Sequence, residues 1–336
     1  MILSLDRPSR VAQPPARRQE PSGLLLDRAR RRGADFLSSC QQASGAITEV
    51  VDDPLAVLRH GGSAADRFFL GGGADIWNTV NAILSLRELG RRHRGAERFV
   101  LRSLLADGSL SHSSRSRGPC AETTAAAILA LPGDHPRIRR ALLRLALPDG
   151  RFPTFIVDAR GGYDIYLTGP STTAWALTAL RSKKGERNAL AGAYRQLERR
   201  GLSALLEDLG DRAIWQGHSA FYGTPFYPAH LAAPLVGRRQ ILDDVVRRQN
   251  SDGGWGFGTR RSPSSALPTA LAMLTLAASS RDDRVRSATG KGARWLVGQQ
   301  AGDGSFPLQP APQSLWYTGK VYVTAVVLRA LGRAAA

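Results

Sequence analysis

A tight turn built on Asp-Gly recurs along this chain and divides it into units that each hold two helical segments. Clear copies of the turn are Asp107-Gly108, Asp149-Gly150, Asp252-Gly253 and Asp303-Gly304, and degenerate copies are Ser44-Gly45 and Gly210-Asp211. A small-residue helical segment follows each turn, starting around Thr79, Thr124, Thr173, Pro228, Thr269 and Thr324. Because these starts lie 41 to 55 residues apart, the sequence predicts six irregular copies of one unit that are stable only when packed together.

The two helical segments of each unit differ in charge. The first kind is charged on one face and apolar on the other, and it occupies residues 27–40, 96–105, 135–146, 187–200, 238–249 and 287–300. The second kind is nearly uncharged and rich in Ala, Leu and Thr, and it occupies residues 78–89, 122–131, 171–180, 227–236, 268–277 and 323–331. Uncharged helices are typically buried and two-faced helices lie outside them. This alternation favours an all-α (α/α)6 toroid, with six inner and six outer helices, over an open solenoid, which would need capping repeats.

Composition places these repeats in a globular protein with a basic N-terminal arm. Residues 1–32 contain eight Arg, three acidic residues and four Pro, so we expect a disordered arm before a single domain at 33–336. The 336-residue chain has a formal net charge of +18 and no run of eighteen apolar residues. Its two cysteines cannot form a disulfide framework, which favours a cytoplasmic protein. The arm can contact an anionic membrane or remain solvated, and no nucleic-acid-binding motif accompanies it.

Two of the turns carry a more specific pattern. Residues 249–256 read Gln-Asn-Ser-Asp-Gly-Gly-Trp-Gly and residues 300–306 read Gln-Ala-Gly-Asp-Gly-Ser-Phe, and both resemble the QW repeats of squalene, oxidosqualene and class II diterpene cyclases. Residues 215–228 and 315–322 are similar to two further segments of bacterial class II diterpene cyclases. The resemblance, which extends to protein prenyltransferase β subunits, implies one β-type terpene cyclase domain. In that family the Gln stacks on the aromatic residue after the turn.

The acidic motif that supplies the proton in class II cyclases is missing from this chain. Where the family has Asp-x-Asp-Asp-Thr-Ala at the start of an inner helix, residues 169–174 read Gly-Pro-Ser-Thr-Thr-Ala. No Asp-x-Asp-Asp occurs elsewhere in the sequence. The resemblance therefore implies the scaffold and an isoprenoid substrate, and the proton donor has to be sought among other residues.

Aromatic residues gather near the starts of the inner helices, which a toroid brings together at one end. They are Trp77, Phe155, Tyr163, Tyr166, Trp175, Phe221, Tyr222, Phe226, Tyr227, Trp316, Tyr317 and Tyr322. Aromatic faces stabilise a cation, and an apolar aromatic pocket keeps water away from it. We therefore predict that these residues bind an isoprenoid substrate; the alternative is that they only pack the end of the barrel.

Three carboxylates near the same helix starts are candidates for the proton donor, namely Asp164, Asp75 and Glu122. An acid that protonates an alkene must stay protonated near neutral pH, which requires a dry site or a second negative charge. Asp75 and Glu122 also fit the alternative role of helix N-capping. Asp164 is ranked first because tyrosines flank it in the loop before the helix that has lost the acidic motif.

Cations and histidines complete the set of candidates. Lys320, in a Gly-Lys segment shared with the family, is the first candidate for binding a diphosphate, which Mg²⁺ can assist. Further loop cations are Arg151, Arg160, Arg260 and Arg261. His218 and His230 can serve as a general acid or base, or as structural residues. The two cysteines lack a second ligand at metal spacing, so we predict no metal site of the zinc type.

The sequence favours a class II-type terpene cyclase that protonates a prenyl or prenyl diphosphate substrate without the usual acidic motif. Two alternatives stay open. One is a prenyl-binding protein or partner subunit without turnover, and the other is a prenyl diphosphate isomerase or lyase that uses the same pocket. Glycoside hydrolysis, which needs paired carboxylates, is a poorer fit because aromatic residues outnumber carboxylates around the predicted pocket.

Overall fold

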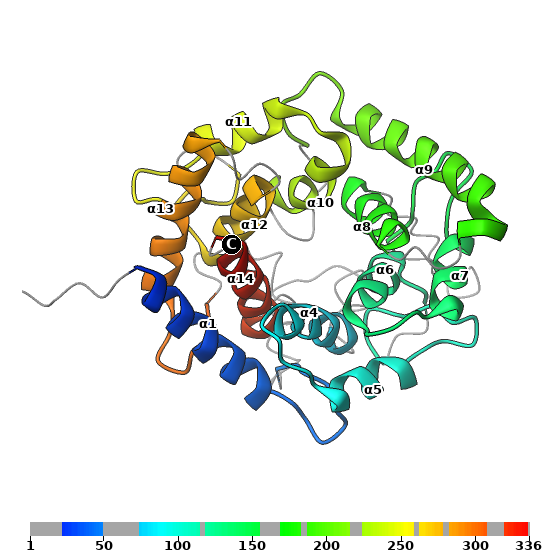
Figure 1. Ribbon diagram of the computed structural model, residues 1–336, viewed down its shortest axis with the longest axis horizontal. Coiled ribbons are helices and arrows are strands. Elements are labelled where there is room, and N and C mark those ends of the chain that lie inside the picture. Colours follow the sequence, from blue (N-terminus) through cyan, green and yellow to red (C-terminus); the bar gives the residue numbers. More distant parts are fainter. Residues whose placement is uncertain are drawn as a thin grey trace, which may run out of the picture.

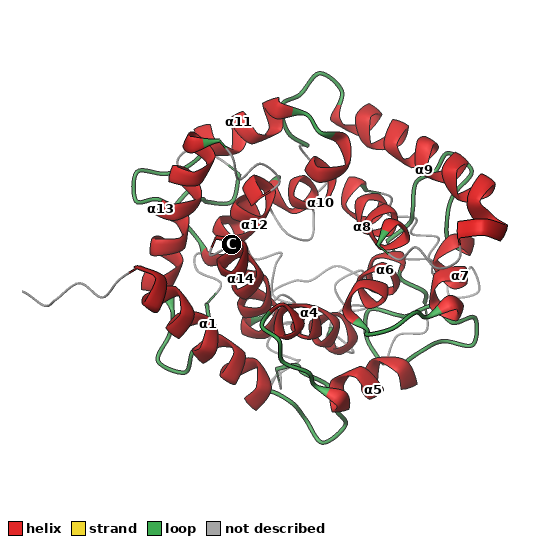
Figure 2. Cartoon of the chain, in the orientation of Figure 1, coloured by secondary structure: helices red, strands yellow, loops and turns green. Residues whose placement is uncertain are grey.

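The computed structural model folds into two concentric rings of helices (Figures 1 and 2). It describes residues 22–49, 74–114, 118–154, 169–182, 187–215, 224–258, 262–277, 282–307 and 319–334. Within these ranges the inner ring consists of α4 (Asp75–Glu88), α6 (Ala121–Ala130), α8 (Pro170–Arg181), α10 (Phe226–Val236), α12 (Ala266–Leu276) and α14 (Lys320–Ala334). The outer ring consists of α1 (Ser22–Ser39), α5 (Arg94–Arg102), α7 (Pro136–Arg144), α9 (Arg187–Leu209), α11 (Arg239–Arg247) and α13 (Asp283–Gln299). The predicted (α/α)6 toroid is therefore confirmed.

The inner helices are buried on nearly every side because each contacts its neighbours and the outer ring. In α6, for example, nine of the ten residues are buried, and its alanines allow close approach. Each inner helix packs against the next in chain order, and α14 packs against α4, which closes the ring. Within the described ranges, no helix has the length and apolar character needed to cross a bilayer.

The glycine turns adopt one conformation around the ring. Glycine has φ between +88° and +94° at positions 45, 108, 150, 253 and 304, a region that other residues rarely adopt. In the four Asp-Gly turns, the Asp carboxylate accepts a hydrogen bond from the amide two residues later. The residue after the turn donates its amide to a threonine hydroxyl of the next inner helix, for example Trp255 N to Thr269 Oγ1 at 2.9 Å. Equivalent hydrogen bonds are accepted by the hydroxyl groups of Thr79, Thr124, Thr173 and Thr324.

The glutamines of the two QW-like turns connect successive outer helices. Gln249 Nε2 donates to the carbonyl of its own turn glycine and to Ala288 O in α13, both at 2.8 Å. Gln300 Nε2 donates to its turn glycine and to Ala29 O in α1, both at 2.9 Å. Because α1 and α13 are the first and last outer helices, the bonds from Gln300 close the outer ring.

Two sets of helix boundaries differ from the sequence prediction. The inner helices begin two to four residues before the Thr or Pro predicted to start them. The threonine is instead a residue of the first turn, as the bond from Thr79 Oγ1 to Asp75 O at 2.6 Å shows. The second difference is that α1 begins at Ser22, so residues 22–32 are helical although composition assigned them to the disordered arm. This segment is ordered because Leu26 and Ala29 pack against the core.

Gly304→Ala is expected to destabilise the protein by about 2 kcal/mol, because alanine is strained at positive φ. In addition, a Cβ at this position would lie 2.5 Å from the backbone oxygen of Arg32 in α1. Chemical denaturation measures the effect. Gly302→Ala is the matched control, because a Cβ two residues earlier meets no atom within 4 Å. Equal stability of the two variants would contradict a role for Gly304 in closing the outer ring.

Candidate active site

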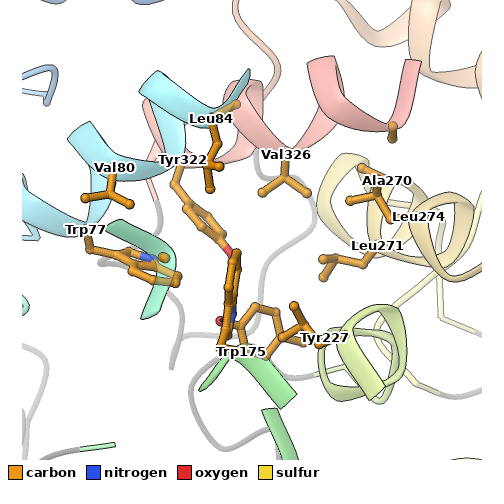
Figure 3. Close-up of a cluster of buried hydrophobic side chains, with 14 of the residues drawn as sticks. Trp77, Val80, Leu84, Trp175, Tyr227, Ala270, Leu271, Leu274, Tyr322 and Val326 are labelled. Atoms are coloured by element: carbon orange, nitrogen blue, oxygen red, sulfur yellow. Dashed lines mark hydrogen bonds between the residues drawn. The ribbon is translucent and has the colours of Figure 1, made fainter. Parts of the chain in front are cut away.

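The repeat sets the side chains that face the interior of the inner ring in layers. In each helix, the position of a side chain is counted from the threonine that accepts the hydrogen bond from the turn amide. The first layer lies two residues before this threonine, the second layer two residues after it, and the third layer five residues after it. Because an α-helix rises 1.5 Å per residue, the first and third layers are about 10 Å apart. The labelled side chains in Figure 3 point toward one another across the ring. The first layer holds Trp77, Glu122 and Tyr322, the second holds Trp175, Leu271 and Val326, and the third holds Leu84, Leu274 and Arg329.

A chain of hydrogen bonds leads from Trp175 through Tyr227 to Glu122. Trp175 Nε1–H donates to the Tyr227 hydroxyl at 3.2 Å, and this hydroxyl donates to Glu122 Oε1. Because the indole N–H can only donate, the Tyr227 oxygen accepts it, and the single phenolic proton is directed at Glu122. A protonated Glu122 therefore accepts at Oε1 and carries its own proton on Oε2.

Burial controls the protonation of Glu122, which lies in the first turn of α6 with 5% of its surface exposed. Loss of solvent disfavours the carboxylate and raises the pKa of Glu122 to about 7, against the opposing effect of the hydrogen bond from Tyr227. The group thus stays protonated near neutral pH, while a donor already faces the carboxylate that would form. Both properties suit a general acid.

Aromatic rings line the interior on the side of Glu122. Trp77 stacks on Tyr322 with ring centroids 5.9 Å apart, and it meets Trp175 edge-on at 6.0 Å from across the ring. His112 stacks on Trp77 at 5.7 Å, and burial lowers the pKa of this histidine to about 4, so the imidazole is neutral. Phe226 is buried next to Tyr227 at the start of α10. The arrangement is a dry aromatic wall with one protonated acid in it.

His230, in α10, is a neutral imidazole beside Trp175. Its Nδ1 lies 2.6 Å from Tyr227 O, and because a carbonyl only accepts, Nδ1 carries the proton and Nε2 keeps its lone pair. Burial and the positive charge of Arg329 lower the pKa of His230 to about 3. The ring meets Trp175 edge-on at 6.4 Å.

Other predicted site residues have structural partners. Asp75 accepts hydrogen bonds from the backbone amide and the hydroxyl of Ser114, which tie a loop to the start of α4. Lys320 Nζ lies 3.7 Å from the Asp303 carboxylate, and its side chain is 55% exposed. Arg151 forms ion pairs with Asp149, Glu207 and Asp208. These contacts hold the three side chains without a substrate.

Several predicted residues lie outside the described ranges and stay predictions. They are Phe155, Arg160, Tyr163, Asp164, Tyr166, His218, Phe221, Tyr222, Arg260, Arg261, Trp316 and Tyr317. Within the described ranges, no group of three His, Cys, Asp or Glu side chains could hold a metal ion.

Sequence reasoning missed two features of the interior. It named Glu122 and Tyr227 separately but not the bond between them, because the residues are 105 positions apart. It also missed Arg329, whose helix reads as an ordinary buried segment. The register of the repeat could have found Arg329, since it lies five residues after Thr324, in the layer of Leu84 and Leu274.

Comparison with known proteins identifies the fold. The chain matches no protein-family model. It is 30% identical to drimenyl diphosphate synthase from Streptomyces showdoensis over 203 residues, which are 58% of this chain and 36% of the synthase. The type II terpene cyclase MstE from Scytonema, in complex with geranylgeranyl dihydroxybenzoate, superposes with a TM-score of 0.68 at 16% identity over 94% of this chain and 99% of that chain. The ent-copalyl diphosphate synthase from Streptomyces platensis superposes with a TM-score of 0.60 at 21% identity, over 78% of this chain and 51% of that chain.

The chain has the fold of type II terpene cyclases, and at this level the resemblance seen in the sequence is confirmed. The aligned segment spans about a third of the length of the drimenyl diphosphate synthase. The superposition with MstE covers nearly the whole of that chain.

The raised pKa of Glu122 predicts a pH-dependent stability. The unfolded chain loses this proton near pH 4.5 and the folded protein near pH 7, so the free energy of unfolding falls as pH rises between these values and is constant above them. The full effect is about 3 kcal/mol.

Denaturation of the wild type and Glu122→Gln at pH 5 and pH 8 measures this effect as the difference between the two proteins. The comparison is needed because His112 and His230, with lowered pKa values, change stability in the opposite direction at low pH. If the free energies of unfolding of the wild type and Glu122→Gln change equally between pH 5 and pH 8, Glu122 is not held protonated in the folded protein.

Proposed function

We propose that this chain is a class II-type terpene cyclase, which protonates an alkene of a prenyl or prenyl diphosphate substrate and cyclises the carbocation inside the inner ring. The observation that carries the proposal is the buried Glu122 carboxyl group, which faces Tyr227 at the end of the ring lined by Trp77 and Tyr322. The shared fold and the partial alignment with drimenyl diphosphate synthase support this class of reaction.

The reaction begins when the Oε2–H bond of Glu122 breaks and the proton adds to one alkene carbon, using the π electrons for the new C–H bond. The neighbouring carbon becomes a tertiary carbocation, and the next double bond attacks it to form a ring. The final cation then gives up a proton and the Glu122 carboxylate takes one up, so the charges balance and the product is an isomer of the substrate. The faces of Trp77, Trp175 and Tyr322 stabilise the cations, each by about 2 kcal/mol or more when desolvated.

Tyr227 stabilises the carboxylate that forms at Glu122. Its hydrogen bond to Oε1 joins two neutral groups before proton transfer and becomes charge-assisted afterwards, which makes it about twice as strong. An interaction that strengthens along the reaction lowers its barrier. Because Trp175 already fixes the direction of the phenolic proton, the donor needs no reorganisation as the charge develops.

Incubation with geranyl, farnesyl and geranylgeranyl diphosphates, followed by product analysis, tests the proposal. A cyclic isomer of the substrate supports the cyclase. Binding without product would favour the prenyl-binding protein, and release of diphosphate or a shifted double bond without a ring would favour the lyase or isomerase.

Glu122→Gln is expected to lower kcat at least a hundredfold, because the amide accepts the hydrogen bond from Tyr227 but has no acidic proton to give. Glu97→Gln is the matched control: Glu97 is also buried but lies in the outer helix α5, paired with Arg92. Asp164→Asn tests the first candidate from the sequence. If Asp164→Asn abolishes turnover and Glu122→Gln retains it, Glu122 is not the proton donor.

Tyr227→Phe is expected to move the alkaline limb of the activity profile to higher pH. Turnover requires protonated Glu122, so it falls as pH rises through about 7 in the wild type. Removing the Tyr227 hydrogen bond, which lowers this pKa, raises the pKa further, while kcat decreases because the new carboxylate loses its donor. Tyr194→Phe, in the outer helix α9, is the control. If the alkaline limb of the pH–activity profile is the same in Tyr227→Phe as in the wild type, Tyr227 does not act on the proton donor.

A further inference from the structure

Arg329 reaches across the inner ring from α14 toward α8. Its Cζ lies 6.0 Å from the centroid of the Trp175 ring. In Figure 1, α14 and α8 stand on opposite sides of the inner ring, with α4 and α6 between them on one side and α10 and α12 on the other. A contact between opposite helices can only be made through the interior. The guanidinium group therefore faces the interior, in the third layer.

Among the described residues, the positive charge of Arg329 is paired with one carboxylate that it shares with a second arginine. Glu88 Oε1 lies 3.6 Å from Arg329 Nε and 3.6 Å from Arg333 Nη2, so one carboxylate serves two guanidinium groups. Within the part of the chain that the structure describes, the buried Arg329 Nε has no hydrogen-bond partner. An uncompensated positive charge at this point would repel a carbocation held among the aromatic rings. An anion beside the guanidinium group would remove this repulsion.

Side chains of the third layer are somewhat more exposed than the aromatic rings of the first layer. In the first layer, Trp77 and Tyr322 are 0% and 1% exposed, whereas Leu84 and Leu274 in the third layer are each 9% exposed. The Arg329 side chain is 15% exposed. A charged group held here keeps part of its solvation, while an apolar chain attached to it extends into the dry end.

We propose that Arg329 binds an anionic head group of the substrate, a diphosphate or a carboxylate, at the C-terminal end of the inner ring. The inference rests on the proposed function and deepens it, because it orients the substrate with its head group at Arg329 and its terminal alkene at Glu122, about 10 Å away along the ring axis. A guanidinium binds either oxyanion through two parallel hydrogen bonds. This places the head group at the opposite end of α14 from Lys320, the first candidate from the sequence.

The test measures binding in the Glu122→Gln background, so that turnover does not interfere. The probes are farnesyl diphosphate, a farnesylated dihydroxybenzoate and neutral farnesol, with Kd obtained by calorimetry. Arg329→Ala is expected to raise Kd at least tenfold for an anionic probe and less than twofold for farnesol, and Arg329→Lys to restore part of the loss. Arg333→Ala is the matched control, because Arg333 is the other cation beside Glu88 and its side chain is 60% exposed. We expect Arg333→Ala to change Kd less than twofold for every probe.

The outcomes separate this proposal from the cyclase itself. A loss confined to the diphosphate or to the benzoate supports the site and identifies its oxyanion. Equal losses for farnesol and the anionic probes, no loss in Arg329→Ala, or no binding of either anionic probe by the parent would overturn the proposal. Binding that depends on Arg329 without any cyclic product from the wild type would refute the cyclase and leave the anion site standing.

Discussion

Closure of the two rings is the constraint on which the rest of the structure depends. α14 packs against α4 to complete the inner ring, and Gln300 bonds the last outer helix to α1. Glu122, Tyr227, Trp175 and Arg329 come from four different inner helices. Trp175 and Tyr227 lie on the neighbouring helices α8 and α10, but Tyr227–Glu122 and Arg329–Trp175 join helices that are not neighbours, so these two contacts run across the interior of the curved ring. The chemistry of the interior is thus a property of the closed ring.

Two opposing effects act on Glu122, and their balance defines the acid. Burial among apolar and aromatic groups raises its pKa, and the hydrogen bond from Tyr227 lowers it. Burial alone would give a proton that is hard to release, and the hydrogen bond alone would give a carboxylate with no proton to donate. With both in place a substantial fraction of the carboxyl group keeps its proton near pH 7, and the carboxylate that forms faces the Tyr227 hydroxyl. The absence of the acidic motif of class II cyclases is therefore compatible with a general acid elsewhere in the ring.

The fold was largely predictable because its signals are local. Glycine turns and helix polarity repeat along the sequence, a threonine recurs in five of the six units, and together they predict the six units correctly. The errors at the starts of the inner helices have a common cause: the sequence prediction begins each helix at its threonine, whereas the hydroxyl of Thr79 or Thr124 accepts a bond from the preceding loop from within the first helical turn. At the site, Glu122 ranked behind Asp164 because a carboxylate at a helix start fits capping equally well. The structure describes Glu122 and adds its partner Tyr227.

The sequence by itself determined the toroid, because burial pattern and turn chemistry depend on residues close together in the chain. Only the tertiary structure decided which side chains meet inside it. Tyr227 and Glu122, or Arg329 and Trp175, are more than a hundred residues apart and belong to helices that are not neighbours in the ring. Their approach depends on the diameter of the closed ring and on the relative heights of opposite helices, which no local pattern records.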